Sequence, residues 1–451
     1  MSGFSAAVKI GDLDDFLSPA ADCVILPAEP ATKQPKGSVI KDKENVASIT
    51  LSDCLACSGC VTSAETLLLQ SQSVDELMTK PSKDTLICIT VSSASRRALS
   101  AHLDIHPSKL CSFIESKLNS VLQPSRVVVI DSSTCEAIAV SETVKESRTR
   151  GSVLTSHCPG WTCYATKVLD ESVLSLLSRI KSPEQIVGIS VKELVRKASY
   201  RSSWRSIHVA SIPSLHFIES TLSTPCLEIF HILISPCFDK KLEVIRPDYT
   251  VGTGEKGVDL VLSSTELLDL ISKSTSRTES VKKTDVFDVL GLRDSWMVSR
   301  TDCESGGGYA QAGALEQSTS SHIEWKGGKN KDLFEFKTFM RSHGFRNIQN
   351  ITRRIKSGTL ADKQIVEVMA CPGACVRGGG QPVETGAKMK KITSNAVTHV
   401  CPPEELRSAR LLRSLLVEMA GSEDIFQSLI STEWKGIQLN ADGVTVSSLK
   451  W

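Results

Sequence analysis

Three cysteines near the start of the chain stand three residues apart, in the pattern C-x-x-C-x-x-C. They are Cys54, Cys57 and Cys60, and the small residues between them let the backbone fold tightly. Three thiols with this spacing on a loop can wrap the corners of one cuboidal metal cluster. Structural zinc more often uses two separated C-x-x-C pairs, so the compact triplet favours an iron–sulfur cluster, with zinc as the alternative.

A cuboidal cluster needs a fourth ligand besides this triplet. Cys23 is the nearest upstream cysteine. Closing a loop of about thirty residues costs little more entropy than closing a shorter one, so the distance is no obstacle. Spacing alone does not select Cys23 over another cysteine.

The cysteine content argues against a disulfide framework. The chain has 15 cysteines, an odd number, and residues 1–26 carry four acidic residues instead of the basic flank and apolar run of a secretion signal. The net charge of +1 gives no reason to expect nucleic acid as a partner, and no apolar run approaches the roughly 18–20 residues that span a bilayer. We expect a cytosolic or nuclear protein whose clustered cysteines bind metal.

Short apolar runs alternate with helical patterns from residue 84 onwards. This alternation predicts an α/β fold with mostly parallel sheets. In addition, Ser263 to Glu266 form a plausible N-cap for a helix over 267–272. The other expected strands are 85–91, 126–130, 153–155, 230–234, 258–262 and 365–369, and the other expected helices are 94–102, 107–122, 134–147, 161–179, 332–343 and 402–420.

Polar segments suggest where the chain divides. Residues 27–45, 273–284 and 302–330 are rich in Pro, Ser, Gly or charge, and we interpret them as surface loops or linkers. The expected organisation is a small N-terminal unit, two α/β lobes and a C-terminal tail, over 1–82, 83–290, 291–420 and 421–451.

Further cysteines follow three of the predicted strands. Cys158, Cys237 and Cys371 each come shortly after an apolar run, and Cys375 follows Cys371 by four residues. The carboxyl ends of parallel strands are where α/β folds place their sites. A single cysteine after a strand is more often an inert core thiol, so each signal is weak alone.

The last of these segments carries the most information. After Cys371 and Cys375 come Gly378, Gly379, Gly380 and, two residues later, Pro382. Glycines at this position suggest a backbone that lies close to a prosthetic group. A phosphate-binding glycine loop is the alternative, but no Gly-Lys-Ser/Thr follows.

Taken together, the three segments resemble the signatures of iron-only hydrogenases. The sequence has T-S-H-C-P-G-W, S-P-C-F-D-K and E-V-M-A-C-P-G-A-C-V-R-G-G-G-Q-P where hydrogenases have T-S-C-C-P-x-W, M-P-C-x-x-K and E-x-M-x-C-x-x-G-C-x-x-G-G-G-x-P. With the N-terminal triplet, the chain resembles the eukaryotic iron-only-hydrogenase-like family, also called nuclear prelamin A recognition factor-like proteins. The resemblance implies a two-lobed parallel-sheet core with a small N-terminal iron–sulfur unit.

The resemblance also implies two 4Fe-4S clusters and their ligands. Cys23, Cys54, Cys57 and Cys60 would hold the first cluster, and Cys158, Cys237, Cys371 and Cys375 would hold a second cluster buried between the lobes. The other seven cysteines have no partner spacing; of these, Cys88 and Cys163 are expected in the core, and no role is assigned to Cys111, Cys135, Cys226, Cys303 or Cys401.

Three departures from the hydrogenase pattern bear on activity. His157 replaces the cysteine that relays protons in hydrogenases, Ser235 replaces a methionine and Ala374 replaces a glycine, whereas Lys240 is kept. Histidine can also move protons, so His157 alone does not forbid proton transfer. The replacements together argue against a catalytic di-iron unit, and we expect no enzyme activity.

The family resemblance implies a cytosolic iron–sulfur protein assembly factor. It would receive clusters from upstream scaffold proteins and pass them to a targeting complex that includes a WD40 propeller, for cytosolic and nuclear apoproteins. Trp451 ends the chain, as a terminal Trp ends several clients and adaptors of that complex, although Lys450 stands at a usually acidic position. The rival hypotheses are an iron-only hydrogenase or related redox enzyme, and a nuclear prelamin A-binding protein.

Overall fold

The computed structural model describes part of the chain, and that part falls into two compact units. The units are Met1–Thr66 and Leu67–Trp451. In the first unit, β1 Val8–Ile10 pairs antiparallel with β2 Ala47–Ile49. The described residues are 8–10, 47–49, 72–79, 85–122, 126–199, 228–246, 255–273, 307–318, 323–327, 333–382 and 407–434.

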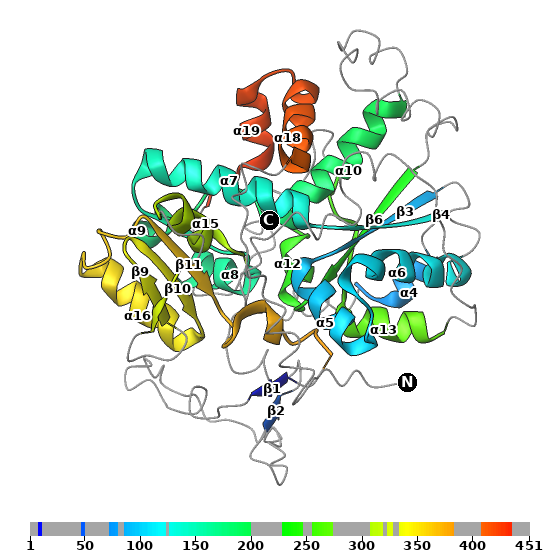
Figure 1. Cartoon of the computed structure of the whole chain (residues 1–451), viewed down its shortest axis with the longest axis horizontal. Helices are drawn as coiled ribbons and strands as arrows, with labels where there is room; N and C mark the ends of the chain where they lie inside the picture. The colour runs from blue at the N-terminus through cyan, green and yellow to red at the C-terminus, as the bar shows by residue number, and fades with distance from the viewer. Residues whose placement is uncertain are drawn as a thin grey trace, which may run out of the picture. The chain divides into compact units, whose positions relative to one another are not determined.

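The second unit contains a four-stranded parallel sheet (Figure 1). β3 is the first strand of this sheet in sequence. The next strand, β4, lies on one side of it, and the following strand, β6, lies on the other, so the direction of winding reverses beside β3. The carboxyl edge at such a reversal is the usual ligand site of an open α/β sheet. The bounds are β3 Thr85–Val91, β4 Arg126–Asp131, β6 Glu228–Ser235 and β7 Leu260–Ser263.

A five-stranded mixed sheet lies beside the first, in the order β5-β11-β10-β9-β8. β5, β11 and β10 are parallel, whereas β9 and β8 continue the sheet antiparallel. β5 belongs to this second sheet although its residues fall within the segment 83–290, so the second lobe takes a strand from early in the chain. The bounds are β5 Val153–Thr155, β8 Lys326–Gly327, β9 Leu333–Phe336, β10 Phe339–His343 and β11 Ile365–Met369.

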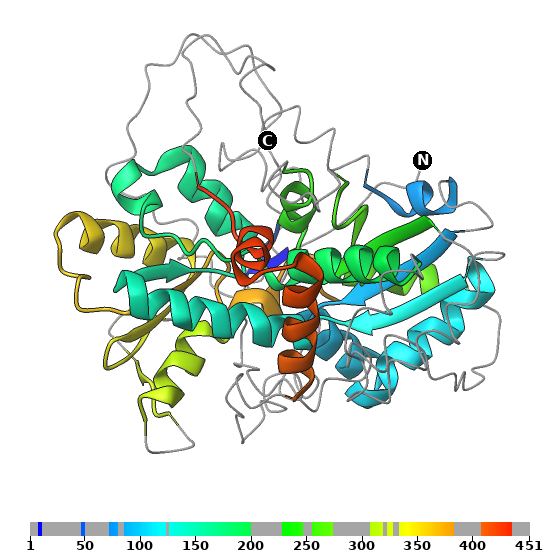
Figure 2. The ribbon, with the colours of Figure 1, turned by 90° about the horizontal axis from the view of Figure 1, so that it is seen from above.

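Helices cover both faces of both sheets (Figures 1 and 2). α5 Ser93–Leu103, α6 Pro107–Val121 and α13 Ser264–Ser272 pack on one face of the first sheet, and α8 Pro159–Val168 and α16 Phe345–Lys356 pack on one face of the second. One continuous core fills the other face of both sheets beneath α7 Ser133–Arg150, with residues from β3 and β4 and from β10 and β11. α7 therefore ties the two lobes together.

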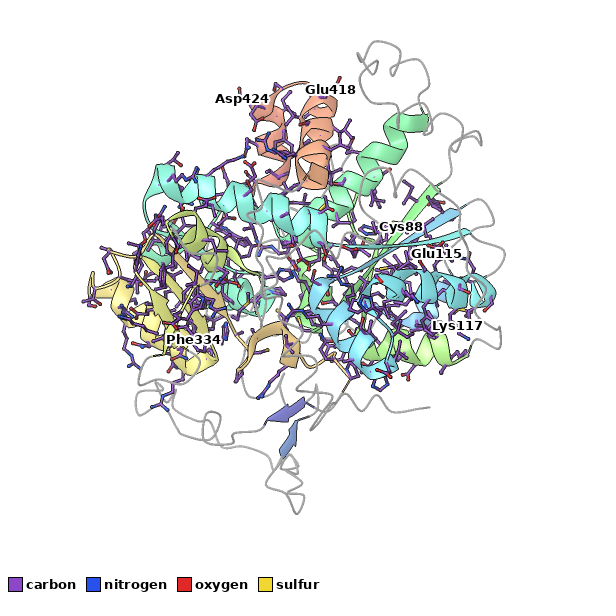
Figure 3. All side chains as sticks on the ribbon, in the orientation of Figure 1. Cys88, Glu115, Lys117, Phe334, Glu418 and Asp424 are labelled. Atoms are coloured by element: carbon purple, nitrogen blue, oxygen red, sulfur yellow. The ribbon has the colours of Figure 1, made fainter. Side chains whose placement is uncertain are left out.

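Further helices complete this shared core. Apolar residues of α10 Pro183–Ser199, α15 Tyr309–Glu316, α18 Arg407–Ala420 and α19 Glu423–Ile430 join it. The residues Glu418 and Asp424 lie on the exposed side of α18 and α19, whereas Cys88 is fully buried on β3, as expected (Figure 3). The remaining short helices are α4 Val74–Thr79, α9 Glu171–Leu174 and α12 Asp239–Glu243.

The prediction of a helix over 332–343 is wrong, because this segment is the β9–β10 hairpin. The apolar residues Leu333, Phe336 and Met340 happen to recur at helical spacing, and this spacing led to the wrong prediction. The turn between the strands uses Lys337 at φ 48°, so no glycine marks it in the sequence. The α/β class of this lobe is unaffected.

Two further boundaries differ from expectation. Residues 309–316, inside the expected loop 302–330, form the helix α15, in which Tyr309 and Ala310 are almost fully buried. Small residues such as Gly313 made the segment resemble a linker, but a Cβ at Gly313 would come within 2.6 Å of Phe339, so the small residue permits close packing on the sheet. The expected helix 161–179 ends at Val168, and α9 follows as a separate short turn.

The expected tail 421–451 begins with an ordered helix. α19 packs on α18, and Phe426 and Ile430 are buried in the shared core. Within the part of the chain that the structure describes, no helix is both long and apolar enough to cross a membrane.

Candidate metal centre

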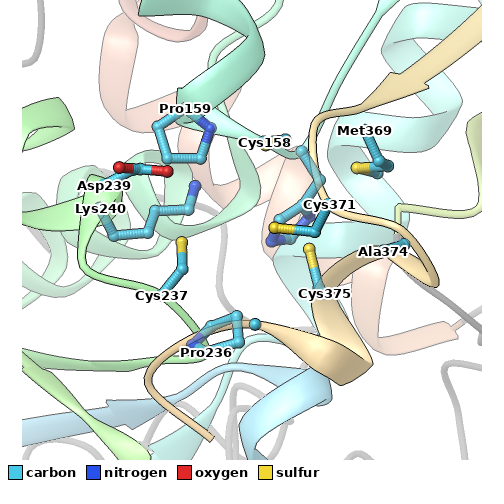
Figure 4. A pocket seen from close by; sticks show the side chains of 12 residues that line it. Cys158, Pro159, Pro236, Cys237, Asp239, Lys240, Met369, Cys371, Ala374 and Cys375 are labelled. Carbon is cyan, nitrogen blue, oxygen red and sulfur yellow. The ribbon is translucent and has the colours of Figure 1, made fainter. Parts of the chain in front are cut away.

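Four cysteines surround one pocket at the carboxyl edges of the two sheets (Figure 4). Cys158 follows β5, Cys237 follows β6, and Cys371 and Cys375 follow β11, as the sequence predicted. None of these four described cysteines is in a disulfide bond. The other residues that line the pocket are His157, Pro159, Pro236, Asp239, Lys240, Met369, Ala374 and Gly378.

Cys158 is placed by the start of α8. It is the N-cap residue of the helix, and Pro159 occupies the first helical position, where its missing N–H costs nothing. Burial and Asp239 raise the pKa of the Cys158 thiol, and the backbone N–H groups of Ala370, Trp161 and Gly160 offset only part of that rise. A thiolate at this sulfur would therefore be stabilised by a helix N-terminus.

The glycine-rich loop after β11 lies directly on the loop that carries Cys237. Gly380 N–H donates to the carbonyl oxygen of Pro236 at 2.9 Å, and a Cβ on Gly378 would come within 2.3 Å of that same oxygen. Only glycine allows this approach. The glycines therefore let the loop that carries Cys375 pack on the loop that carries Cys237. The close approach seen here is to a neighbouring loop, and the expected approach to a prosthetic group stays a prediction.

The thiols are held in a setting that opposes their ionisation. Burial raises the pKa of Cys158, Cys237 and Cys375, and Asp239 and the other thiols add to the rise at Cys237. Thiolates are nonetheless the form that binds metal. A positively charged iron core in the pocket would offset this penalty, so binding would be coupled to loss of thiol protons.

The arrangement suits a cluster better than a single ion. Among the described residues, no three His, Cys, Asp or Glu side chains converge as they would around one metal ion. In a cuboidal 4Fe-4S cluster each thiolate binds a different iron, so its four ligands stand apart around a central space. Four cysteines from three loops around one pocket fit that requirement.

Comparison with known proteins agrees with this geometry. The family model of the iron only hydrogenase large subunit, C-terminal domain, matches residues 86–214 and 219–379, a span that includes all four cysteines of the pocket. The chain is 34% identical to Protein NAR1 of Arabidopsis thaliana over 432 residues, covering 86% of each chain. It is 29% identical to cytosolic iron-sulfur assembly component 3 of Mus musculus over 514 residues, covering 100% of each.

The chain belongs to the iron-only-hydrogenase-like family. Solved FeFe-hydrogenases share its fold: HydA(deltaEFG) has a TM-score of 0.58 at 18% identity, covering 85% of this chain and 100% of that one. HydA1 from Chlamydomonas reinhardtii has a TM-score of 0.55 at 16% identity, covering 83% and 99%. The two-lobed α/β architecture expected from the sequence is thus confirmed.

A buried ionic network lies on one side of this hydrogenase-like pocket. Glu184, at the start of α10, is fully buried, and its carboxylate contacts His157 Nε2 at 2.6 Å and Lys240 Nζ at 3.1 Å. Lys240 Nζ also contacts Glu243 Oε2 at 2.6 Å. Burial raises the pKa of Glu184, but His157 and Lys240 outweigh burial and hold that pKa well below its usual range.

Sequence reasoning missed Glu184. Lys240 and His157 were noted through the hydrogenase-like motifs, but nothing in the sequence links them to a glutamate in the first turn of a separate helix. The network joins the two lobes, because His157 follows a strand of the second sheet whereas Lys240 follows a strand of the first. Burial lowers the pKa of Lys240, but Glu184 and Glu243 outweigh burial and raise that pKa well above its usual value, so the lysine is charged.

Glu367 on β11 is a second buried carboxyl group of the hydrogenase-like core. It accepts hydrogen bonds from Gly308 N–H and Ala310 N–H, both at 3.1 Å, and so caps α15 from another element. The N-cap residue Gly308 has no side chain to do this. Burial raises the pKa of Glu367 to about 7, although the two N–H groups lower it.

The three residues that differ from the hydrogenase pattern lie at different positions relative to the pocket. His157 lines the pocket, whereas Ser235 lies behind it, where its hydroxyl donates to the carbonyl of Cys237 at 3.2 Å. Ala374 adopts a left-handed conformation at φ 55°, which disfavours any residue with a Cβ. The glycine of the hydrogenase pattern is therefore explained by backbone conformation, and this chain tolerates strain there.

Several predicted site residues lie outside the described residues. They are the four expected ligands of the N-terminal cluster and the terminal tryptophan, namely Cys23, Cys54, Cys57, Cys60 and Trp451. Of the cysteines without an assigned role, Cys226, Cys303 and Cys401 also lie outside. Cys163, Cys111 and Cys135 are buried away from the pocket lining.

Proposed function

We propose that this chain is a cytosolic iron–sulfur protein assembly factor, like the relatives that are named so. The observation that carries the proposal is the pocket in which Cys158, Cys237, Cys371 and Cys375 meet from both sheets. These residues would hold a 4Fe-4S cluster, which supplies a redox-active and transferable inorganic core when it is bound. The name of the mouse relative, cytosolic iron-sulfur assembly component 3, supports a role in assembly rather than catalysis.

The second part of the proposal is a further 4Fe-4S cluster on Cys23, Cys54, Cys57 and Cys60. The C-x-x-C-x-x-C spacing supports it. The chain would link early scaffold proteins to a late targeting complex that includes a WD40 propeller, and so deliver clusters to cytosolic and nuclear apoproteins. The N-terminal cluster is the better candidate for exchange, because polar loop sequence flanks its ligands.

The third part of the proposal is that the chain does not turn over hydrogen. The residues His157, Ser235 and Ala374 differ from the hydrogenase pattern around the pocket, and this supports a protein that holds a cluster without a catalytic di-iron unit. Infrared spectroscopy tests this directly, because carbonyl and cyanide ligands of a di-iron unit absorb where proteins do not. Such bands in the purified protein would contradict the proposal and favour the hydrogenase alternative.

Iron and sulfide quantitation with electron paramagnetic resonance tests cluster binding. The anaerobically purified chain should carry about eight irons, and the Cys371→Ser/Cys375→Ser variant about four, because each four-cysteine site holds four irons. Cys163→Ser is a matched control, since Cys163 is buried on α8 but does not line the pocket. Zinc in place of iron, or an iron content that the double substitution leaves unchanged, would overturn the assignment of this pocket.

Loss of each site should have a different consequence. We expect the pocket cluster to lock the two lobes together, so Cys371→Ser should lower the melting temperature more than Cys60→Ser does. Equal melting temperatures and equal soluble yields for the two variants would refute this division.

The tail is tested separately. Deleting Trp451 should weaken capture of the WD40-containing targeting complex while leaving the iron content unchanged, because a terminal Trp is a strong interface anchor. Capture that is unaffected by the deletion would contradict that role. A prelamin A-binding protein, the remaining alternative, would keep its partner after all eight cysteines are replaced.

A further inference from the structure

A buried arginine of the second sheet has no anionic partner. Arg341 lies in the middle of β10, and its side chain is 8% exposed. Among the described residues its guanidinium makes no ion pair, and its Nε has no hydrogen-bond partner. Charged side chains are almost never buried without a partner, because an unpaired charge loses its water at a large cost in free energy. The guanidinium is therefore a candidate for recognising an anion.

The two carboxyl groups on the neighbouring strands are engaged elsewhere. Glu335 on β9 contacts Arg354 Nη1 at 3.0 Å and Lys363 Nζ at 3.1 Å. It points to the opposite face of the sheet, because side chains alternate along a strand and the preceding residue contacts Arg341. Glu367 is paired with Arg341 on β11, but its carboxyl group accepts from two N–H groups at the start of α15. Neither carboxyl group neutralises the guanidinium by direct contact.

Two aromatic rings hold the guanidinium of Arg341 in place. Its Cζ lies 4.3 Å from the ring centroid of Trp325 and 5.4 Å from that of Phe334, which is labelled in Figure 3. The indole N–H of Trp325 donates to Gln311 Oε1 at 2.6 Å, so this ring is itself fixed. Both rings are partly exposed, and the guanidinium therefore lies just beneath the surface. Stacking occupies its faces and leaves its edge, which carries the N–H donors, for a ligand.

The charge of this region selects the kind of anion. The ring of His343 lies 5.9 Å from that of Phe334, and burial and Arg341 lower the pKa of His343 to about 4, so it is neutral at pH 7. The carboxyl group of Glu367 is close enough for Arg341 to lower its pKa. One positive charge with a carboxyl group beside it favours a singly charged anion over a doubly charged phosphate. The planar guanidinium edge matches a carboxylate.

We propose that Arg341, Trp325 and Phe334 form a binding site for a carboxylate that is carried on an apolar stem. The two carboxylate oxygens accept from N–H groups at the edge of the guanidinium, and the stem packs on the aromatic rings. The site is separate from the candidate metal centre, because none of these residues lines that pocket. Two sources share this chemistry, namely a free organic acid and an acidic side chain of a bound peptide.

The experiment is fluorine nuclear magnetic resonance on the full-length holoprotein labelled with 5-fluorotryptophan. The chain has six tryptophans, and the resonance that is lost in Trp325→Phe belongs to Trp325. Sodium benzoate should shift this resonance saturably, whereas benzamide, which has the same shape without the charge, should not. Arg341→Met should weaken benzoate binding about tenfold or more, the loss expected for a hydrogen bond between charged groups. Arg353→Met is the matched control, because Arg353 is exposed on α16 and its loss changes the net charge equally.

A second titration distinguishes the two sources of the carboxylate. It uses a capped tripeptide with a central glutamate, and its glutamine analogue as control. Tighter binding of the glutamate peptide than of benzoate would support the site and identify a protein partner. Binding of benzoate alone would support the site and identify a free organic acid.

Each contrary result overturns a stated part of the proposal. Equal shifts with benzamide would mean that the rings bind apolar groups without using the charge. Tighter binding of phenyl phosphate would overturn the choice of a carboxylate, and unchanged benzoate binding in Arg341→Met would overturn the site. If Arg341→Met fails to fold, thermal unfolding of the wild-type protein decides, because a ligand of the folded state raises the melting temperature. Benzoate should then raise it and benzamide should not, and equal melting temperatures would overturn the proposal.

Discussion

The two sheets of the second unit differ in how they are built and in what they give to the pocket. The first sheet is wholly parallel, is buried on both faces and contributes one of the four cysteines. The second sheet is mixed, ends in the partly exposed strands β9 and β8, and contributes the other three. Most of the pocket cysteines therefore follow strands of the sheet whose outer strands are partly exposed.

Connectivity sharpens the contrast. In the second sheet, β5 pairs with β11, and these strands come from segments far apart in the sequence. Their pairing must offset a large loop-closure entropy. Because Cys158 follows β5 and Cys371 follows β11, a shared cluster would cross-link these strands just beyond the sheet. The second sheet should therefore depend on the cluster more than the first does.

Loss of the cluster gives the largest expected effect. In the Cys371→Ser/Cys375→Ser variant, the amides of β5 and β11 should lose hydrogen-exchange protection by about 5 kcal/mol or more, since ligation energy is folding energy in metal-dependent lobes. The amides of β3 and β4 should change much less. Hydrogen exchange read by mass spectrometry measures both sheets at once, with Cys163→Ser as control. Equal loss in the two sheets would break the comparison.

Replacing Glu184 should destabilise the chain by breaking the buried ionic network that joins the two lobes. In Glu184→Ala, Lys240 keeps Glu243 but loses its contact across the lobes, and His157 loses its carboxylate partner; breaking a buried ionic pair costs about 3–5 kcal/mol. Chemical denaturation of the two proteins measures the loss.

A surface ion pair supplies the control for Glu184. Lys356 and Asp170 are 2.7 Å apart, but both side chains are about half exposed, and Asp170→Ala should stay within about 0.5 kcal/mol of the wild-type protein. A similar small loss for Glu184→Ala would mean that the network does not join the lobes.

The sequence predicted the first sheet better than the second, for physical reasons. Strands buried on both faces are continuous apolar runs, and the segment 85–91 matches β3 residue for residue. In the second sheet, the turn at Lys337 has no glycine to mark it, and α15 is built from small residues that resemble a linker. Local patterns of this kind do not report packing against distant elements.

The pocket shows the same limit. The sequence placed its four cysteines, because each follows a strand end in a recognisable motif. Glu184 could not be found in this way, since its contact with His157 arises only when α10 packs against the loop after β5. Motifs therefore predicted the four cysteines that line the pocket, whereas the residues that orient the surroundings of these cysteines required the structure.

Glu367 gives the next prediction, and it concerns the second sheet. Its pKa is raised from 4.5 to about 7 in the folded chain, so between these values the folded state holds a proton that the unfolded state releases. The stabilisation is complete below pH 4.5 and is lost as the pH rises through about 7, by about 3 kcal/mol in all. Glu367→Gln should lack this pH dependence.

Denaturant unfolding of the wild-type protein and Glu367→Gln at pH 5 and pH 8 measures the difference. The gap in unfolding free energy between the two proteins should move in favour of the variant at the higher pH. Parallel curves would mean that Glu367 has the same affinity for protons in both states, and that the cap of α15 is not linked to pH.

The smallest effect concerns the corresponding helix of the first lobe. α13 is capped locally, because Ser263 Oγ accepts from Glu266 N–H at 3.2 Å and Glu266 Oε2 accepts from Ser263 N–H at 2.7 Å. Ser263→Ala should cost about 1 kcal/mol, the usual loss for such a cap. Ser272→Ala, at the exposed end of the same helix, should be nearly neutral and serves as the control.

Since Ser263 does not titrate, the cost of Ser263→Ala should be the same at pH 5 and pH 8, unlike that of Glu367→Gln. The two helices would then be stabilised in different ways, α13 by neighbours in sequence and α15 by a carboxyl group from a distant strand. A pH-dependent loss in Ser263→Ala would contradict this difference, and would point instead to Glu266, which also contacts Lys241 at 2.8 Å, as the residue that stabilises the helix.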